Sequence, residues 1–235
     1  MIRPPNTTAV FIYVKDTMKL ESVGILIELR PLSERDSLAR IFTCDYGVMT
    51  GVMRGAVVAK KNRPLIGQVG TVIWNARLDS QLGVFHWEGG RNMAAHVMAD
   101  ASRLGMLTAA FSLLAALLPE RERYDVLYRE TIDFLERLPV ASRAADIYLE
   151  WEENFLRDIG YALDLKSCAG CGGHDNLNYL SPRTCRAVCD RCAAPYIGRL
   201  YRLPMTLDTG RRLLEQIFAA QGGVMPAARQ ILRDK

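Results

Sequence analysis

The feature that most constrains this chain is a cysteine-rich segment in its C-terminal half. Five of the six cysteines lie in CAGCGGHDNLNYLSPRTCRAVCDRC, residues 168 to 192. Two pairs have the spacing C-x-x-C, with seventeen residues between them: Cys168 with Cys171, and Cys189 with Cys192. A C-x-x-C turn delivers two thiolates to one metal ion, and four thiolates complete the tetrahedral shell of Zn²⁺. The spacing therefore predicts a zinc site with these four cysteines as ligands.

Other uses of the same cysteines fit less well. Disulfides are typical of secreted proteins, and we find no basic segment or A-x-A-like cleavage site of a secretion signal, so we expect a reducing, cytoplasmic setting. A catalytic zinc keeps one position open for water, whereas four thiolates close the shell, so the predicted ion is structural. Cys185 and His174 lie in the same segment. Since each C-x-x-C pair is already complete, the simplest interpretation leaves both outside the site.

The composition and the charge pattern indicate a globular protein that contacts a polyanion. The chain has 49% hydrophobic and 24% charged residues and a net charge of +4. Its longest apolar run, residues 104 to 118, is shorter than the roughly 20 residues that span a bilayer, so we expect a core helix and no membrane association. Segments 30–63 and 166–235 are basic, whereas 91–165 is acidic. This order suits a protein whose two ends meet a polyanion.

The N-terminal part has the pattern of a small β domain. Alternating apolar residues and frequent glycines predict about five short strands over residues 18 to 90. In one of them Val72, Trp74 and Ala76 share a face, which favours Trp74 as a core residue. Such a domain fits a small barrel such as an OB-fold, and a fragment of a β-sandwich is the alternative. Residues 1 to 17 are interpreted as an N-terminal appendage.

The acidic part, residues 91 to 165, has the pattern of a helical domain. Trp151 and Phe155 belong to an apolar stripe that recurs every four residues, and we interpret the neighbouring acids, Glu152 among them, as a solvated helix surface. Pro119 and Pro139 mark the breaks between proline-free segments. The predicted helices are residues 91 to 118, 124 to 138 and 141 to 164.

The C-terminal part of the chain is predicted to consist of two segments. Residues 166 to 200 are predicted to form the zinc module. Residues 201 to 235 are predicted to hold C-terminal helices that pack on the helical domain, one of them over residues 207 to 221, which Gly222 and Gly223 close. The predicted fold class is therefore α+β: an N-terminal OB-fold β-barrel, a helical middle domain and a small four-cysteine zinc module.

Basic side chains of the N-terminal domain are the candidate contacts to nucleic acid. Lysine and arginine on a curved β surface track phosphates without reading sequence, and a solvated basic surface without a ligand is the alternative. The densest piece is RGAVVAKKNR, residues 54 to 63. The candidates are Arg30, Arg35, Arg40, Arg54, Lys60, Lys61 and Arg63.

Two further sets of side chains have open interpretations. Aromatic rings of the N-terminal domain either stack on bases or belong to its core. Arginines of the zinc module either add a second cationic surface or form an ordinary charged exterior. The aromatic set is Phe42, Tyr46, Trp74, Phe85 and Trp87, and the arginine set is Arg183, Arg186 and Arg191.

In the order of these parts, the chain resembles members of the RecO family of bacterial recombination mediators. The matching pieces are GILIELRPLSERDSLARIFTCDYGVMTGVMRG, the segment IGYALDL at residues 159 to 165, the first C-x-x-C with the glycine after it, and Ser181-Pro182-Arg183. Together they span about Met18 to Phe218. The resemblance implies an OB-fold, a helical middle and a zinc-stabilised module.

The resemblance also implies a function. Such proteins bind single- and double-stranded DNA and anneal complementary strands, including strands coated by single-stranded DNA-binding protein. With RecR they help to load RecA during recombinational DNA repair, which places them in the cytoplasm at the nucleoid. We therefore expect a mediator that is not an enzyme.

Two other classes of function compete with this expectation. An enzyme that acts on nucleic acid has little support, because the three histidines are far apart in sequence and the chain has no G-x-x-x-x-G-K-[ST] phosphate loop. The second alternative is a zinc-containing scaffold that recruits proteins and has no direct activity on DNA.

Overall fold

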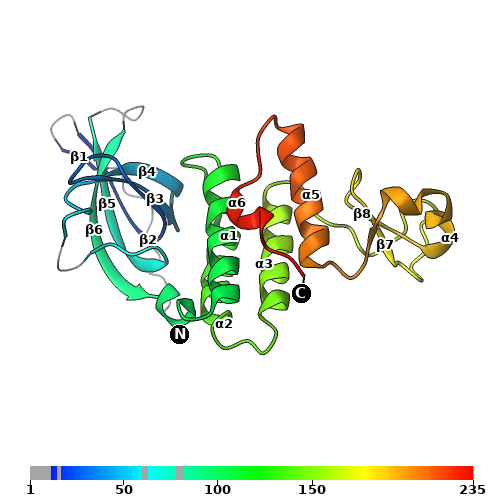
Figure 1. Cartoon of the computed structure of the whole chain (residues 1–235). Coiled ribbons are helices and arrows are strands. Elements are labelled where there is room, and N and C mark those ends of the chain that lie inside the picture. Colours follow the sequence, from blue (N-terminus) through cyan, green and yellow to red (C-terminus); the bar gives the residue numbers. More distant parts are fainter. Residues whose placement is uncertain (1–11, 15–16, 60–62, 78–81, 235) are drawn as a thin grey trace. The chain divides into compact units, whose positions relative to one another are not determined.

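The chain divides into two compact units, which are described separately. The structure is a computed structural model that describes residues 12–14, 17–59, 63–77 and 82–234 (Figure 1). The first unit comprises Met1–His96 and Leu118–Tyr128, and the second comprises Val97–Leu117 and Arg129–Lys235. In the described part of the chain, every helix is too short or too polar to cross a membrane.

The first unit is built on one six-stranded sheet. β2 pairs with β3 and β5, β3 with β4, β4 with β6, and β6 with β5, so the pairings of these five strands form a closed cycle. β1 pairs with the start of β2, so residues 12 to 14 of the predicted appendage form a strand. The strands are β1 (Ile12–Val14), β2 (Thr17–Pro31), β3 (Ser37–Thr43), β4 (Gly47–Met53), β5 (Gln68–Ala76) and β6 (Gly83–Asn92).

The long strand β2 makes the closed cycle possible. Its first half pairs with β5 and its second half with β3, and Gly24, where the two ladders overlap, is paired with both Thr43 and Gly70. A Cβ at Gly24 would lie 2.5 Å from the side chain of Ile41, so the crowding between the strands requires a glycine there.

Trp74 of β5 is wholly buried in the core of this unit, as its alternation predicted. Its indole Nε1 donates a hydrogen bond to the carbonyl of Thr50 at 3.2 Å, which satisfies the one polar atom of the ring. Gly83 lies directly against the ring, because a Cβ there would approach the indole to 2.1 Å. Phe85 packs in the same core.

A segment from between two helices completes the first unit. Within Leu118–Tyr128, Glu120 forms a parallel bridge with Val48, and the N–H of Arg121 donates to the Val48 carbonyl at 2.9 Å. The Arg121 guanidinium lies 4.4 Å from the ring centroid of Trp74, which is cation–π geometry. The chain therefore leaves the second unit, contributes this segment to the first unit, and then returns to the second.

The second unit holds most of the helical residues and the cysteine-rich module, whereas most of η1 and the first turn of α2 belong to the first unit. Figure 1 shows α1, α3 and α5 side by side, and α6 packs against α1. The helices are α1 (Ala101–Leu117), α2 (Asp125–Arg137), α3 (Ala144–Asp158), α4 (Asp190–Ala193), α5 (Leu207–Ala220) and α6 (Ala227–Gln230). Short 3₁₀ helices are η1 (Ala94–Val97) and η2 (Ala194–Arg199), and the small strands are β7 (Tyr179–Ser181), β8 (Arg186–Val188) and β9 (Tyr201–Arg202).

The start of the first predicted helix is wrong by ten residues. α1 begins at Ala101 because β6 continues to Asn92 and η1 follows it. Asp100 caps the helix: its Oδ1 accepts the N–H groups of Ser102 and Arg103 at 3.0 and 3.1 Å. The absence of proline therefore showed where a helix is possible, whereas the cap decided where it begins.

The interpretation of Glu152 as a solvated residue is also wrong. Glu152 is 1% exposed and forms an ion pair with the wholly buried Arg229, with Nε–Oε2 and Nη2–Oε1 distances of 2.6 and 2.9 Å. The Tyr148 hydroxyl donates to Glu152 Oε2 at 2.7 Å. Arg229 also donates to the carbonyls of Leu207 at 2.8 Å and Leu232 at 3.3 Å. The pair thus joins α3, the start of α5 and the C-terminal segment.

Gly210 of α5 makes room for this pair. A Cβ there would lie 2.1 Å from Glu152 Oε1 and 2.9 Å from Arg229 Nη2. A glycine inside a helix costs about 1 kcal/mol relative to alanine. At this position the loss of helix stability is tolerated because a larger residue would collide with the ion pair.

We expect Arg229→Met to lower the free energy of unfolding of the second unit by about 3–5 kcal/mol, because it leaves the Glu152 carboxylate buried without a cation. The measurement is urea denaturation followed by far-ultraviolet circular dichroism. The matched control is Arg233→Met, which removes an exposed pair with Asp208 at 3.7 Å and should cost less than about 1 kcal/mol. Equal losses in the two variants would contradict the role given to the buried pair.

Candidate metal centre and nucleic-acid interface

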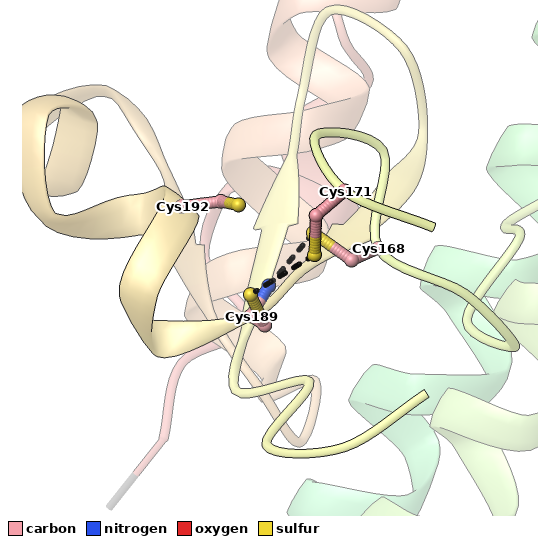
Figure 2. A group of neighbouring side chains, drawn as sticks. All are labelled: Cys168, Cys171, Cys189 and Cys192. Carbon is pink, nitrogen blue, oxygen red and sulfur yellow. Dashed lines mark hydrogen bonds between the residues drawn. The ribbon is translucent and has the colours of Figure 1, made fainter. Parts of the chain in front are cut away.

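The structure brings the four predicted ligands together. Cys168 and Cys171 lie in the loop after α3, Cys189 precedes α4 and Cys192 lies within α4 (Figure 2). Their four sulfur atoms all lie within 4.8 Å of one another, and the Sγ atoms of Cys171 and Cys189 are 3.8 Å apart. Tetrahedral zinc with Zn–S bonds of about 2.3 Å places its sulfurs about 3.8 Å apart. The donor set and its spacing therefore fit a zinc ion.

Backbone N–H groups favour the thiolate form of Cys168. Its Sγ accepts hydrogen bonds from the N–H groups of Cys189 and Gly170, both at 3.3 Å. This donation lowers the pKa of Cys168 to about 6. In contrast, the sulfurs of Cys189 and Cys171 next to Cys192 favour its protonated form and raise its pKa to about 12. A divalent cation among the four sulfurs would lower the pKa values of all four thiols, because it attracts their thiolate forms.

The module around these cysteines has a very small core. Its buried cluster consists of Cys168, Val188, Cys189 and Ala193, and the other buried apolar residues of the module are Leu180, Ala187 and Tyr201. Two of the four predicted ligands are thus core residues themselves. So little apolar burial is seldom enough to hold a fold, and small domains of this kind depend on a metal or on disulfides.

Cys185 and His174 take structural positions outside the group of four. Cys185 occupies the turn between β7 and β8 with a φ of 53°, and its carbonyl accepts the N–H of Asp164 at 2.8 Å. Burial raises the pKa of its thiol. His174 Nδ1 lies 2.8 Å from the carbonyl oxygen of Lys166. The group of candidate ligands in the described residues contains neither side chain.

Two of the arginines predicted to contact nucleic acid are paired with the same carboxylate. Arg30 is exposed, and its Nε donates to Glu28 Oε1 at 2.6 Å. Arg40 is half-buried, with its Nε 3.6 Å from Glu28 Oε2. Because Glu28 contacts both guanidinium groups and offsets one of their two charges, these arginines are weaker candidates for phosphate contacts than their sequence positions suggest.

Arg35 and Arg54 come together at a shallow depression of the first unit. Arg35 lies in the loop between β2 and β3, and Arg54 follows β4. The Gly55 N–H donates to Asp36 Oδ1 at 2.8 Å, and the Val57 N–H donates to the Arg35 carbonyl at 3.1 Å, so the two loops are tied together. Both arginines are exposed, and neither forms an ion pair in the described part of the chain. The lining residues are Ser33, Glu34, Arg35, Asp36, Arg54 and Gly55.

The remaining predicted contacts are less well placed. Arg63 is exposed. Lys60 and Lys61 lie outside the described residues. In the module, Arg183 and Arg191 are exposed, whereas Arg186 is paired with Asp164 at 3.1 Å.

The aromatic candidates of the first unit are mostly core residues. Phe42, Trp74 and Phe85 are buried, and Tyr46 and Trp87 are partly buried and packed against the core cluster. The interpretation of these rings as a base-stacking surface is therefore wrong for the three buried residues, because the curved sheet turns their faces inward.

Comparison with known proteins identifies the family. Two family models, Recombination protein O N terminal and Recombination protein O C terminal, match residues 18–88 and 98–233. A protein of Jannaschia sp. (strain CCS1) named DNA repair protein RecO is 38% identical over 83% of this chain and 80% of its own length. Proteins with the same name are 38% identical in Roseobacter denitrificans (81% and 79% covered) and 35% identical in Rhodospirillum centenum (90% and 92% covered).

These matches cover most of the chain and pair a recombination-protein N-terminal domain with its C-terminal domain. The chain belongs to the RecO family of DNA repair proteins, which confirms the resemblance inferred from the sequence motifs.

We expect the purified protein to carry a single Zn²⁺ per chain, measured by atomic emission. Cys189→Ser should abolish this metal content, because it removes a buried ligand, whereas Cys185→Ser should retain it. Chelation should lower the melting temperature, since the module has little core without the ion. Loss of the metal in Cys185→Ser would show that the ligand set is wrong.

Proposed function

We propose that this chain is a mediator of recombinational DNA repair that binds single-stranded DNA and anneals complementary strands. The observation that carries the proposal is the pair of exposed arginines without carboxylate partners in the described residues, Arg35 and Arg54, on two tied loops of the first unit. Guanidinium groups on such loops contact phosphates and leave base edges free to find a complementary strand.

The proposal assigns a role to each part of the chain. The closed cycle of strands β2 to β6 is the OB-fold expected of the family, and its loops carry the cations. The ion among the four cysteines is Zn²⁺, and its role is structural. Annealing forms base pairs between two complementary single strands and neither makes nor breaks a covalent bond, so the proposed activity requires no catalytic residue.

The family also suggests partners. We infer that the protein acts with RecR to help load RecA onto strands that single-stranded DNA-binding protein coats, in the cytoplasm at the nucleoid. Duplex DNA is the second nucleic-acid ligand in this proposal, through the same phosphate contacts.

An annealing assay tests the proposed function. Labelled complementary oligonucleotides are mixed with the protein without nucleotide or added metal, and with or without coating protein. Duplex formation without covalent change supports the mediator. Cleaved strands would indicate an enzyme, and unchanged DNA would favour the alternative of a zinc-containing scaffold.

The Arg35→Ala, Arg54→Ala double variant should bind single strands more weakly and with a smaller salt dependence. Each phosphate contact on a single strand contributes about −0.7 to the slope of log K against log salt, so two lost contacts should reduce its magnitude by about 1.4. Fluorescence anisotropy titrations at several salt concentrations measure this slope.

The matched control for this experiment is Arg30→Ala, since Glu28 already offsets that charge. Its slope should stay close to that of the unaltered protein. A slope that changes as much in the control as in the double variant would argue against a local site at the two loops.

A further inference from the structure

The 3₁₀ helix η2 exposes apolar side chains, although the module has few apolar residues with which to form a core. All six of its residues are exposed, and Tyr196 and Ile197 have relative exposures of 56% and 53%. Other apolar residues of the module, Leu177, Tyr179 and Leu200, pack against its cysteine core. Tyr196 therefore lies outside the cluster that forms the core of the module, and more than half of its surface is exposed.

Three arginines belong to the same part of the module as Tyr196. Two of them follow it closely in the chain, and the third lies in the turn after β7. Arg199 ends η2, and Arg202 lies in β9. β9 pairs antiparallel with β7 so that Tyr201 is opposite Leu180, which puts the end of η2 beside the turn that carries Arg183. All three arginines are exposed, and none forms an ion pair in the described part of the chain, whereas Arg186 in the adjacent strand is paired with Asp164.

An exposed ring on a module with three exposed arginines that form no ion pair in the described residues fits one class of polyanion best. Single-stranded DNA offers open base faces for the ring and phosphates for the arginines. A duplex offers phosphates, but its base faces are already stacked on one another. An acidic peptide offers charge but has no need of an aromatic face.

We propose that η2 and the arginines around it form a second contact for single-stranded DNA, in which Tyr196 stacks on a base while Arg183, Arg199 and Arg202 contact phosphates. The inference rests on the proposed DNA-binding function and adds to it a site that distinguishes single strands from duplexes. It also adds an exposed ring to a chain in which Phe42, Trp74 and Phe85 of the first unit are buried.

The test compares two substitutions of Tyr196 in the full chain with its metal bound. Fluorescence anisotropy measures binding to a labelled oligothymidine and to a duplex of equal length. Tyr196→Ala should weaken binding to the single strand about tenfold, within the range measured for lost base–aromatic stacking, and leave duplex binding unchanged. Tyr196→Phe, which retains the ring, should bind both as the unaltered protein does.

Zinc content and melting temperature accompany each titration. Both should be unchanged in the two variants, because Tyr196 lies outside the module core. If the protein binds single strands and Tyr196→Ala binds them equally well, the stacking site is overturned while the proposed function stands. If the unaltered protein binds neither DNA, the proposed function itself fails.

Crosslinking on the unaltered protein gives a result that does not depend on any variant. Iodouracil within an oligonucleotide should crosslink to Tyr196 on irradiation. Trypsin cuts after Arg191 and Arg199, so mass spectrometry should find the adduct on the peptide CAAPYIGR, residues 192 to 199. Crosslinks confined to other peptides would overturn the site.

Discussion

The arrangement of the helical unit depends on the ion pair between Glu152 and Arg229. Two charges withdrawn from water are stable only when each meets its partner in good geometry and the remaining hydrogen-bonding atoms are also satisfied. Here Glu152 accepts from Arg229 and Tyr148, and Arg229 also donates to two backbone carbonyls. Because these partners belong to α3, α5 and the C-terminal segment, all three must be in place together for the charges to be paired.

The cysteine-rich module solves a similar problem with a different interaction. Its buried cluster is too small to fix three short strands and two short helices, and two of its members are themselves cysteines. The convergence of four sulfurs within 4.8 Å gives these segments a common centre. In both places a few polar or ionic groups determine how the elements assemble: the cysteines come from one short segment, whereas Glu152 and Arg229 are 77 positions apart.

The sequence predicted best where the signal is local. C-x-x-C spacing identified the cysteines that the structure brings together, and strict alternation identified Trp74 as a core residue. The prediction that Glu152 is solvated failed, because its partner Arg229 lies 77 positions further on and no local pattern links the two. Charge counting also failed to separate Arg30, which Glu28 offsets, from Arg35 and Arg54. Tyr196 was overlooked, although an apolar pair in APYIGR outside any periodic pattern was a usable signal.

The path of Leu118–Tyr128 has a consequence for dissection of the protein. The chain passes between the two units three times, after His96, after Leu117 and after Tyr128. A fragment that stops at His96 lacks the backbone beside Val48 and the guanidinium over Trp74, so it exposes part of an interior that the intact chain covers. The two halves are therefore interlaced along the polypeptide, and a single proteolytic cut cannot release the sheet unit whole.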